Sequence, residues 1–296
     1  MSTPSQRRTA PPHVVLTYHA HHVVGDDYAR NDHVALRRDL ALVTECGGRI
    51  VSLSSIVGAL DRRHPDSDPA HDALCVALTF DDGPAYDVRP FEHPAFGAQP
   101  GFLAVMREFA HSAEGRAQPA LCATSFVIAS PGARQVMESS YDPDYTFLDA
   151  GSMTDAWWDD AIDTGFISIA NHSWDHLHPA LPEVAHSEQA RADFTRVRTQ
   201  ADADAQIAQA QRYIMARTRG RASPYFAYPF GHANAYLAER YFPTCAGHGI
   251  EAAFTVEPRP VDVGDNRFRI PRHVCGHDWR TPEALAAILL GAGHGR

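Results

Sequence analysis

The stretch that decides the fold is LCVALTFDDGP, residues 74–84. Its first part, Leu74 to Phe80, is a short and nearly continuous apolar run, which is typical of a strand buried on both faces of a parallel sheet. Two adjacent carboxylates, Asp81 and Asp82, follow directly. Like charges at short range and partial burial both oppose ionisation, so the pair is favourable where a cation neutralises one of them. Taken alone, such a motif is more often a strand followed by an ordinary Asp-Gly turn.

Short apolar runs and helical patterns alternate on both sides of this strand. Further strands are expected at 13–18, 49–53, 121–129, 166–170, 225–228 and 251–256, and helices at 33–46, 102–111, 154–163, 187–219, 233–241 and from Thr281 onward. Repeated β-α units over 296 residues predict an α/β fold, either a barrel or an open doubly wound sheet. The long helix at 187–219 is expected to lie on the surface, because its apolar positions are sparse. Segments 84–101 and 130–153, with their prolines and glycines, predict long loops.

Composition limits the classes of partner. The chain has 26 basic and 36 acidic residues, a net charge of −10, which argues against nucleic acid and other polyanions. Five scattered cysteines without a C-x-x-C spacing argue against a disulfide framework. Residues 1–12 form a polar arm, expected to be flexible, and no linker divides residues 13–296. Without a signal-peptide core or an apolar run of about 18 residues, we expect a cytoplasmic protein that does not enter the membrane. No feature indicates its oligomeric state.

A second motif, NHSWDHLHP at 171–179, follows the predicted strand 166–170. His172 and His176 are four residues apart and can face one point, and a carboxylate from another strand would complete a His-His-Asp set. Three such ligands leave a position open for water, as in catalytic zinc sites. An isolated pair of this kind is more often two satisfied polar residues. Both motifs end strands, however, and active sites gather at the carboxyl ends of parallel strands.

Three less specific motifs lie at the ends of other predicted strands or in loops. They are FAYPFG at 226–231, LTYH at 16–19, and RIPRH at 269–273 with Asp278 and Trp279 shortly after it. Alone, each reads as an ordinary strand end or loop.

Together, TFDDGP, H-S-x-x-H and FAYPFG resemble the motifs of the polysaccharide deacetylases of the NodB-homology type, carbohydrate esterase family four. Their order and their placement at strand ends match that family from about residue 13 to residue 280. The resemblance implies a distorted (β/α) barrel in one catalytic domain. It also implies one divalent metal ion, with zinc expected, and hydrolysis of an N-acetyl group on an amino sugar or oligosaccharide.

Residue by residue, the resemblance assigns roles to the first two motifs. Asp82, His172 and His176 match the metal ligands, and Asp81 matches the catalytic base. Ser173 stands at the position that steadies the histidine loop by hydrogen bonding. These roles agree with the chemistry, because a divalent ion activates water and a neighbouring carboxylate can take its proton.

The third motif carries the expected oxyanion and substrate contacts. The family pattern places the oxyanion donor at the backbone N–H of Phe230, after Pro229, and Trp279 is expected either to line the substrate pocket or to be an ordinary core residue. One departure concerns Ala227, which stands where the family has an arginine that braces the base. We expect Arg272 to take over this bracing, because a guanidinium can hold a carboxylate through two hydrogen bonds.

A second departure concerns the acid that protonates the leaving amine. The family's usual histidine lies near the C-terminus, where this chain offers only His294, and a tail position suits a preorganised acid poorly. A circularly permuted branch, resembling poly-N-acetylglucosamine deacetylases, opens with the corresponding strand. On that resemblance we assign His19 as the general acid.

Two other functions stay open at this stage. One is metal-dependent hydrolysis of a small non-sugar C–N bond, as in allantoinase-like and imide-cleaving relatives, and the other is carbohydrate binding without catalysis on the same scaffold. Five of the remaining histidines are expected to be bystanders: His21, His22, His178, His186 and His232.

Overall fold

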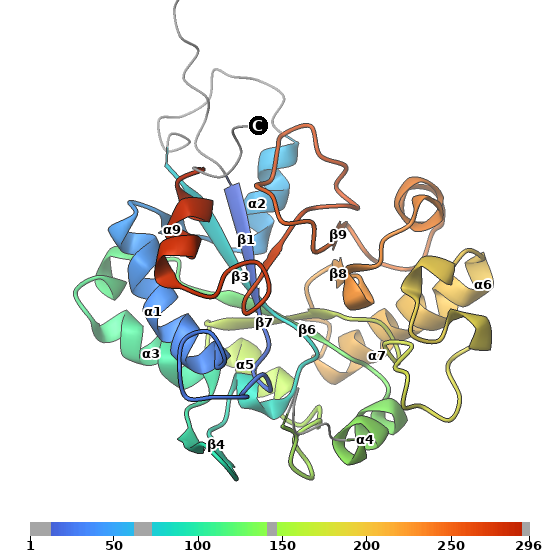
Figure 1. The fold of residues 1–296 in the computed structure, drawn as a ribbon. Helices are drawn as coiled ribbons and strands as arrows, with labels where there is room; N and C mark the ends of the chain where they lie inside the picture. The colour runs from blue at the N-terminus through green and yellow to red at the C-terminus, as the bar shows by residue number, and fades with distance from the viewer. Residues whose placement is uncertain (1–12, 62–72, 141–146, 292–296) are drawn as a thin grey trace, which may run out of the picture.

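Eight parallel strands form one curled sheet in the computed structural model, which describes residues 13–61, 73–140 and 147–291 (Figure 1). Neighbouring strands follow the order β10 (His273–Val274), β1 (His13–Tyr18), β3 (Cys75–Phe80), β6 (Ala123–Val127), β7 (Ile167–Asn171), β8 (Tyr225–Ala227) and β9 (Ala252–Phe254), with β2 (Arg49–Ile50) also beside β3. The expected N-terminal arm and His294 lie outside the described residues.

The segment before β10 links the two edges of this sheet. Ile270 donates its N–H to the carbonyl of Ala253 at 2.9 Å and accepts from the N–H of Thr255 at 2.8 Å, so it lies beside β9. Three residues later, His273 pairs with Leu16 of β1. The sheet therefore curls into a half-barrel with flanking helices, as the distorted (β/α) barrel expected from the sequence requires.

Helices cover the outside of the sheet and α2 lies near its amino-terminal end (Figure 1). They are α1 (Asp32–Glu45), α2 (Leu53–Leu60), α3 (Phe102–His111), α4 (Pro131–Ser139), α5 (Trp158–Asp163), α6 (Gln200–Ala203), α7 (Gln209–Arg217), α8 (Phe242–Thr244) and α9 (Pro282–Leu289). Strand side chains alternate between the barrel interior and these helices. On β1, for example, Val15 belongs to the interior cluster, whereas Val14 and Leu16 pack in the cluster that contains α1 and α3. Within the described ranges no helix is both long enough and apolar enough to cross a bilayer.

The prediction of one long surface helix at 187–219 is wrong in two respects. The first half of this segment is not an α-helix, and part of the polar face of the second half is buried. A helix begins only at Gln200, where the side chain of Thr199 caps it, and the residues before it form short 3₁₀ turns. Its course includes a π-helical segment, Asp204–Ala208, before α7. Two of its polar side chains, Gln206 and Gln211, are buried, because Gln206 donates to Asp175 and Gln211 accepts from Asn171 at the end of β7.

Both segments predicted to be loops contain regular structure. Segment 84–101 contains the hairpin of β4 (Phe91–His93) and β5 (Gly97–Gln99). Segment 130–153 opens with α4, capped by the side chain of Ser130 and with proline at its first position. That Ser-Pro start is a helix signal, which the loop prediction overlooked.

Candidate metal and catalytic site

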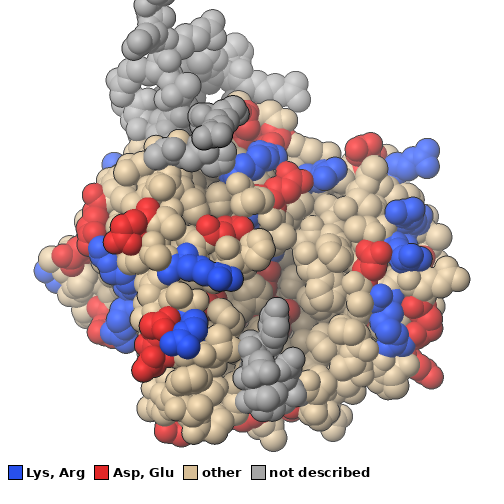
Figure 2. Space-filling model, viewed as in Figure 1, with Lys and Arg blue, Asp and Glu red and all other residues tan. Residues whose placement is uncertain are grey.

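The candidate residues lie at the carboxyl ends of neighbouring strands. Ala77 of β3 and Ala170 of β7 both face the barrel interior. Because strand side chains alternate, Asp81 follows on the same side four residues after Ala77, and His172 follows two residues after Ala170. Figure 2 shows that the surface is hollowed at the centre of the face in view. Figure 1, drawn in the same view, places β6 and β7 near this hollow. Lys and Arg are scattered over this face and form no continuous basic patch.

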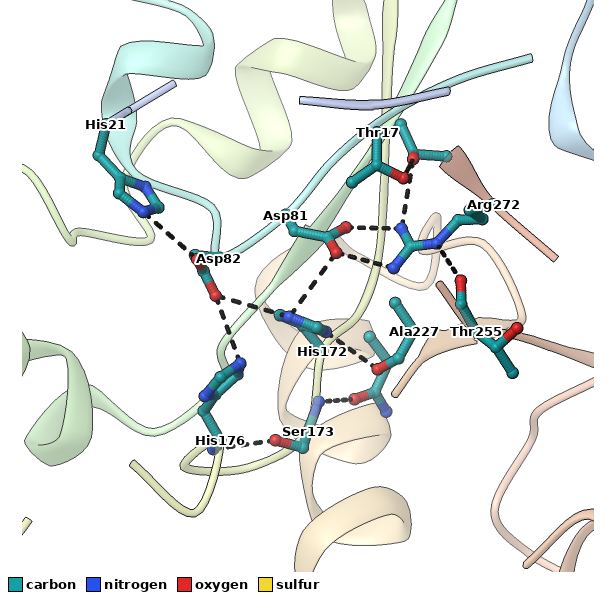
Figure 3. A network of polar contacts seen from close by, with 12 residues as sticks. Thr17, His21, Asp81, Asp82, His172, Ser173, His176, Ala227, Thr255 and Arg272 are labelled. Carbon is teal, nitrogen blue, oxygen red and sulfur yellow. Dashed lines mark hydrogen bonds and ion pairs between the residues drawn. The ribbon is translucent and has the colours of Figure 1, made fainter. Parts of the chain in front are cut away.

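Three side chains converge as a possible metal site. Oδ1 of Asp82 lies 3.5 Å from Nε2 of His172 and 3.6 Å from Nε2 of His176 (Figure 3). One ligand atom from each residue lies within 4.8 Å of the other two. The structure thus brings together the three residues that the sequence motifs nominated as ligands.

The donor atoms of this group suit a cation. His172 donates its Nδ1–H to the carbonyl of Ala227 at 2.9 Å, which leaves the Nε2 lone pair facing Asp82. Burial lowers the pKa of His176 to about 3 against the opposing effect of Asp82, so this ring is neutral at pH 7. Lone pairs and a carboxylate that face one another at these distances fit a divalent ion between them.

Asp82 stays ionised despite its burial. Burial alone would raise the pKa of this carboxyl, but the surrounding imidazoles outweigh that effect and the pKa lies below its usual range. An ionised carboxylate is the form that binds a metal.

The loops that carry these residues have unusual backbone conformations. The described chain has eight non-glycine residues with positive φ, and five lie in the three motif loops: Asp82, Ser173, His176, Leu177 and Phe230. Each such conformation costs about 1–3 kcal/mol and persists only where the surroundings enforce it. Strain of this kind, concentrated at one end of a barrel, is typical of a functional site.

Hydrogen bonds within the histidine loop hold its turn. The side chain of Ser173 accepts the N–H of His176 at 2.9 Å, which is the steadying contact expected from the sequence. The side chain of Asn171 accepts the N–H of Ser173 at 2.8 Å and donates to the carbonyl of Ile207 at 3.0 Å. The loop is therefore fixed both internally and against a helix.

The π-helical segment provides the other half of this anchor. The carbonyl of Gln206 accepts the N–H of Trp174 at 2.7 Å, and the Gln206 side chain donates to Asp175 at 2.8 Å. Asp175 also accepts the N–H groups of Leu177 and Ala185. π segments of this kind occur frequently at functional sites. Here the segment supplies a main-chain carbonyl and a buried amide to the histidine loop.

Arg272 braces Asp81 as the sequence interpretation proposed. Its Nη1 and Nη2 atoms each lie 2.8 Å from one oxygen of Asp81, and the Arg272 side chain is fully buried. The same guanidinium donates to the carbonyl of Thr255 at 3.0 Å and to the hydroxyl of Thr79 at 3.2 Å. Burial acts to raise the pKa of Asp81, but Arg272 and then His172 outweigh it and keep the pKa below its usual value. Asp81 is thus an oriented, ionised carboxylate next to the three candidate metal ligands.

The turn after β1 brings two histidines to the site, where one was expected. His19 interacts electrostatically with both Asp81 and Asp82. His21, predicted to be a bystander, instead places Nε2 at 3.5 Å from Oδ2 of Asp82 (Figure 3). The H-x-H motif directly after a predicted strand was a usable signal, because active-site residues gather at the carboxyl ends of parallel strands. Asp32, which accepts the N–H of His19 at 2.8 Å, had no signal in any motif.

Two residues expected to contact substrate have different surroundings. Trp279 is 1% exposed, packs against Tyr18 and donates its indole N–H to Asp39 at 3.2 Å, so the core alternative is the correct one and the pocket assignment is wrong. Phe230 is 39% exposed and its ring lies 4.4 Å from that of His176, while Pro229 before it is buried.

Comparison with known proteins identifies the architecture. Residues 121–241 match the family model described as polysaccharide deacetylase. The chain also superposes on the Streptococcus pyogenes deacetylase PplD in complex with acetate, at 15% identity and a TM-score of 0.59, over 95% of this chain and 99% of that one. This chain has the polysaccharide deacetylase fold.

Other solved structures with the polysaccharide deacetylase fold agree. IcaB from Ammonifex degensii matches with 17% identity and a TM-score of 0.59, over 95% of this chain and 97% of that one. A de-N-acetylase from Aggregatibacter actinomycetemcomitans matches with 14% identity and a TM-score of 0.56, over 93% and 99%. No curated protein matches the chain. The family match includes the histidine loop and FAYPFG, whereas TFDDGP precedes it in the chain.

Ser173 offers a test of the loop geometry. In Ser173→Ala the N–H of His176 is left buried without its acceptor, which we expect to lower the free energy of unfolding by about 1–3 kcal/mol. Urea unfolding measures this loss. The exposed Ser139→Ala, on α4, is the control and is expected to change stability by less than about 0.5 kcal/mol. Equal stability of the two variants would contradict the anchoring role of Ser173.

Proposed function

We propose that this protein is a metal-dependent hydrolase that removes the N-acetyl group from an N-acetylated amino sugar or oligosaccharide. The observation that carries the proposal is an ionised carboxylate, Asp81, held by Arg272 beside a group of potential ligands in a polysaccharide deacetylase fold. The names of the structural neighbours support it, since one is a deacetylase in complex with acetate and another a de-N-acetylase.

Asp82, His172 and His176 would hold the metal, and zinc is the ion we propose, because two imidazoles and one carboxylate leave an open position. When bound, such an ion lowers the pKa of water and polarises the amide carbonyl. Oδ2 of Asp81 lies 3.9 Å from Nε2 of His172, so the base is next to the ligand set without belonging to it. Asp81 takes the proton of the attacking water, and Arg272 keeps both of its oxygens oriented while it does so.

Two further groups complete the reaction. His19 donates a proton to the leaving amine, from a turn whose N–H is held by the buried Asp32. The backbone N–H of Phe230 donates to the oxyanion of the tetrahedral intermediate. The exposed ring of Phe230, next to His176, offers an apolar face on which a sugar ring can pack. A net charge of −10 disfavours polyanionic substrates.

Acetate release tests the proposed function. The protein, dialysed against buffer and then supplied with Zn²⁺, is expected to release acetate from N-acetylated chitooligosaccharides, to lose this activity with a chelator, and to regain it with Zn²⁺. Activity on cyclic ureides or imides, without acetate release, would instead favour the non-sugar C–N hydrolase. Binding of the oligosaccharides without turnover would indicate a carbohydrate-binding protein. Either result contradicts the deacetylase proposal.

Arg272→Lys tests how the base is tuned. A lysine retains the charge but cannot hold both carboxylate oxygens, so the pKa of Asp81 is expected to rise toward that of a buried carboxyl. Because the base acts in its deprotonated form, the acid limb of the kcat/KM profile should move to higher pH. A pH-rate profile with a thermal melt as the folding check measures this. An unchanged profile in a folded variant would refute the bracing role.

His19→Ala tests the general acid. We expect kcat to fall about 10²- to 10⁴-fold with little change in KM, the usual contribution of a positioned acid. His294→Ala and the exposed His111→Ala on α3 are the matched controls. A large kcat loss confined to His294→Ala would transfer the role to the C-terminal residue.

A further inference from the structure

The turn that follows β1 is held rigidly against the candidate metal group. Oδ2 of Asp32 accepts the N–H of His19 at 2.8 Å, and Oδ1 pairs with the ring of His22 at 2.7 Å. The ring of His33 hydrogen-bonds the carbonyl of Ala20 at 2.8 Å. Asp32 and His33 are each 1% exposed and open helix α1. The position of the turn is therefore set by two buried side chains.

His21 projects from this turn toward Asp82. Its Nε2 atom lies 3.5 Å from Oδ2, whereas Oδ1 faces His172 and His176. Figure 3 shows His21 on the opposite side of the carboxylate from these two rings. His21 is 8% exposed and does not belong to the group whose ligand atoms lie within 4.8 Å of one another. It therefore contacts the ligand Asp82 from outside the ligand set.

The hydrogen-bond partners of the ring determine its tautomer. Nδ1 of His21 is buried and has no partner among the described residues. A proton on Nδ1 would leave a buried donor unsatisfied and turn the Nε2 lone pair against the carboxylate. With the proton on Nε2, the ring instead directs its N–H toward Oδ2 of Asp82, 3.5 Å away. This second arrangement is the favourable one.

We propose that His21 is a positioning residue that donates Nε2–H to Oδ2 of Asp82 and thereby directs Oδ1 alone toward the metal ion. This inference rests on the proposed function, because it concerns the ion on which that function depends. A carboxylate whose outer oxygen is free can turn or bind through both oxygens, and the hydrogen bond removes that freedom. Groups that orient metal ligands in this way contribute about 10- to 100-fold to metal affinity.

Metal affinity, measured without substrate, tests the proposal. The dissociation constant for Zn²⁺ is determined by chelator competition for the full chain and for His21→Ala, His21→Gln and His111→Ala. We expect His21→Ala to weaken Zn²⁺ binding about 10- to 100-fold. His21→Gln should retain most of the affinity, because its amide can donate to the same oxygen, and the exposed His111→Ala should match the unmodified protein.

Two results would overturn the positioning role. Unchanged affinity in His21→Ala would show that the hydrogen bond is not needed. An equal loss in His21→Ala and His21→Gln, with a changed Co²⁺ absorption spectrum in both, would make His21 a metal ligand instead.

Two further measurements distinguish the role of His21 from a failure to fold and from a wrong substrate assignment. Thermal melts of the metal-free proteins check folding, and His21→Leu, which fills the space without a donor, replaces His21→Ala should the latter not fold. If the chain binds Zn²⁺ as expected but releases no acetate, the proposed substrate fails while the role of His21 stands.

Discussion

The buried ion pair between Arg272 and Asp81 is the contact on which the site and the barrel both depend. Arg272 belongs to the segment that links β9 to β1, and Asp81 directly follows β3, 191 residues away in the chain. Removing one partner of such a pair costs about 3–5 kcal/mol, because the other charge is left buried and uncompensated. Closure of the barrel and orientation of the Asp81 carboxylate are thus one structural requirement.

The ion pair between Arg272 and Asp81 also decides which carboxylate charge of the candidate site stays uncompensated. Three carboxyl groups lie close together at the mouth of the barrel: Asp81, Asp82 and Asp87. Arg272 compensates Asp81, and burial raises the pKa of Asp87 well above its usual value, with Asp82 and Asp81 adding to the effect, which favours the neutral form of Asp87. The charge of Asp82 is left facing imidazole rings, of which His176 is neutral. The arrangement of this carboxylate and the two histidine rings fits a divalent cation.

The strained loops around Asp82 are stabilised by hydrogen bonds to neighbouring helical segments. The histidine loop is tied to the π-helical segment Asp204–Ala208, and the turn after β1 is tied to Asp32 at the start of α1. The second anchor could not be predicted, because an isolated aspartate at a helix start is usually a surface cap. The polar residues of the long helix were misjudged for a related reason, since their buried partners, Asn171 and Asp175, lie about 30 to 40 residues earlier in the chain. Sequence periodicity indicates which face is apolar but not which polar group another segment will cover.

The sequence by itself determined the alternating β-α order and the strand ends at which candidate functional residues gather, and its resemblance to a known family nominated Asp82, His172 and His176 as candidate ligands. The strand order and the strand ends follow from short-range spacing, because strand alternation and the parallel direction of strands decide where a side chain after a strand lies. Only the tertiary structure decided that His21 faces Asp82 and that Trp279 lies in the core. It also supplied the contact between Arg272 and Asp81, which the sequence could only suggest. All three depend on the curl of the sheet and on the conformations of its turns, which bring together residues with no local relation in the chain.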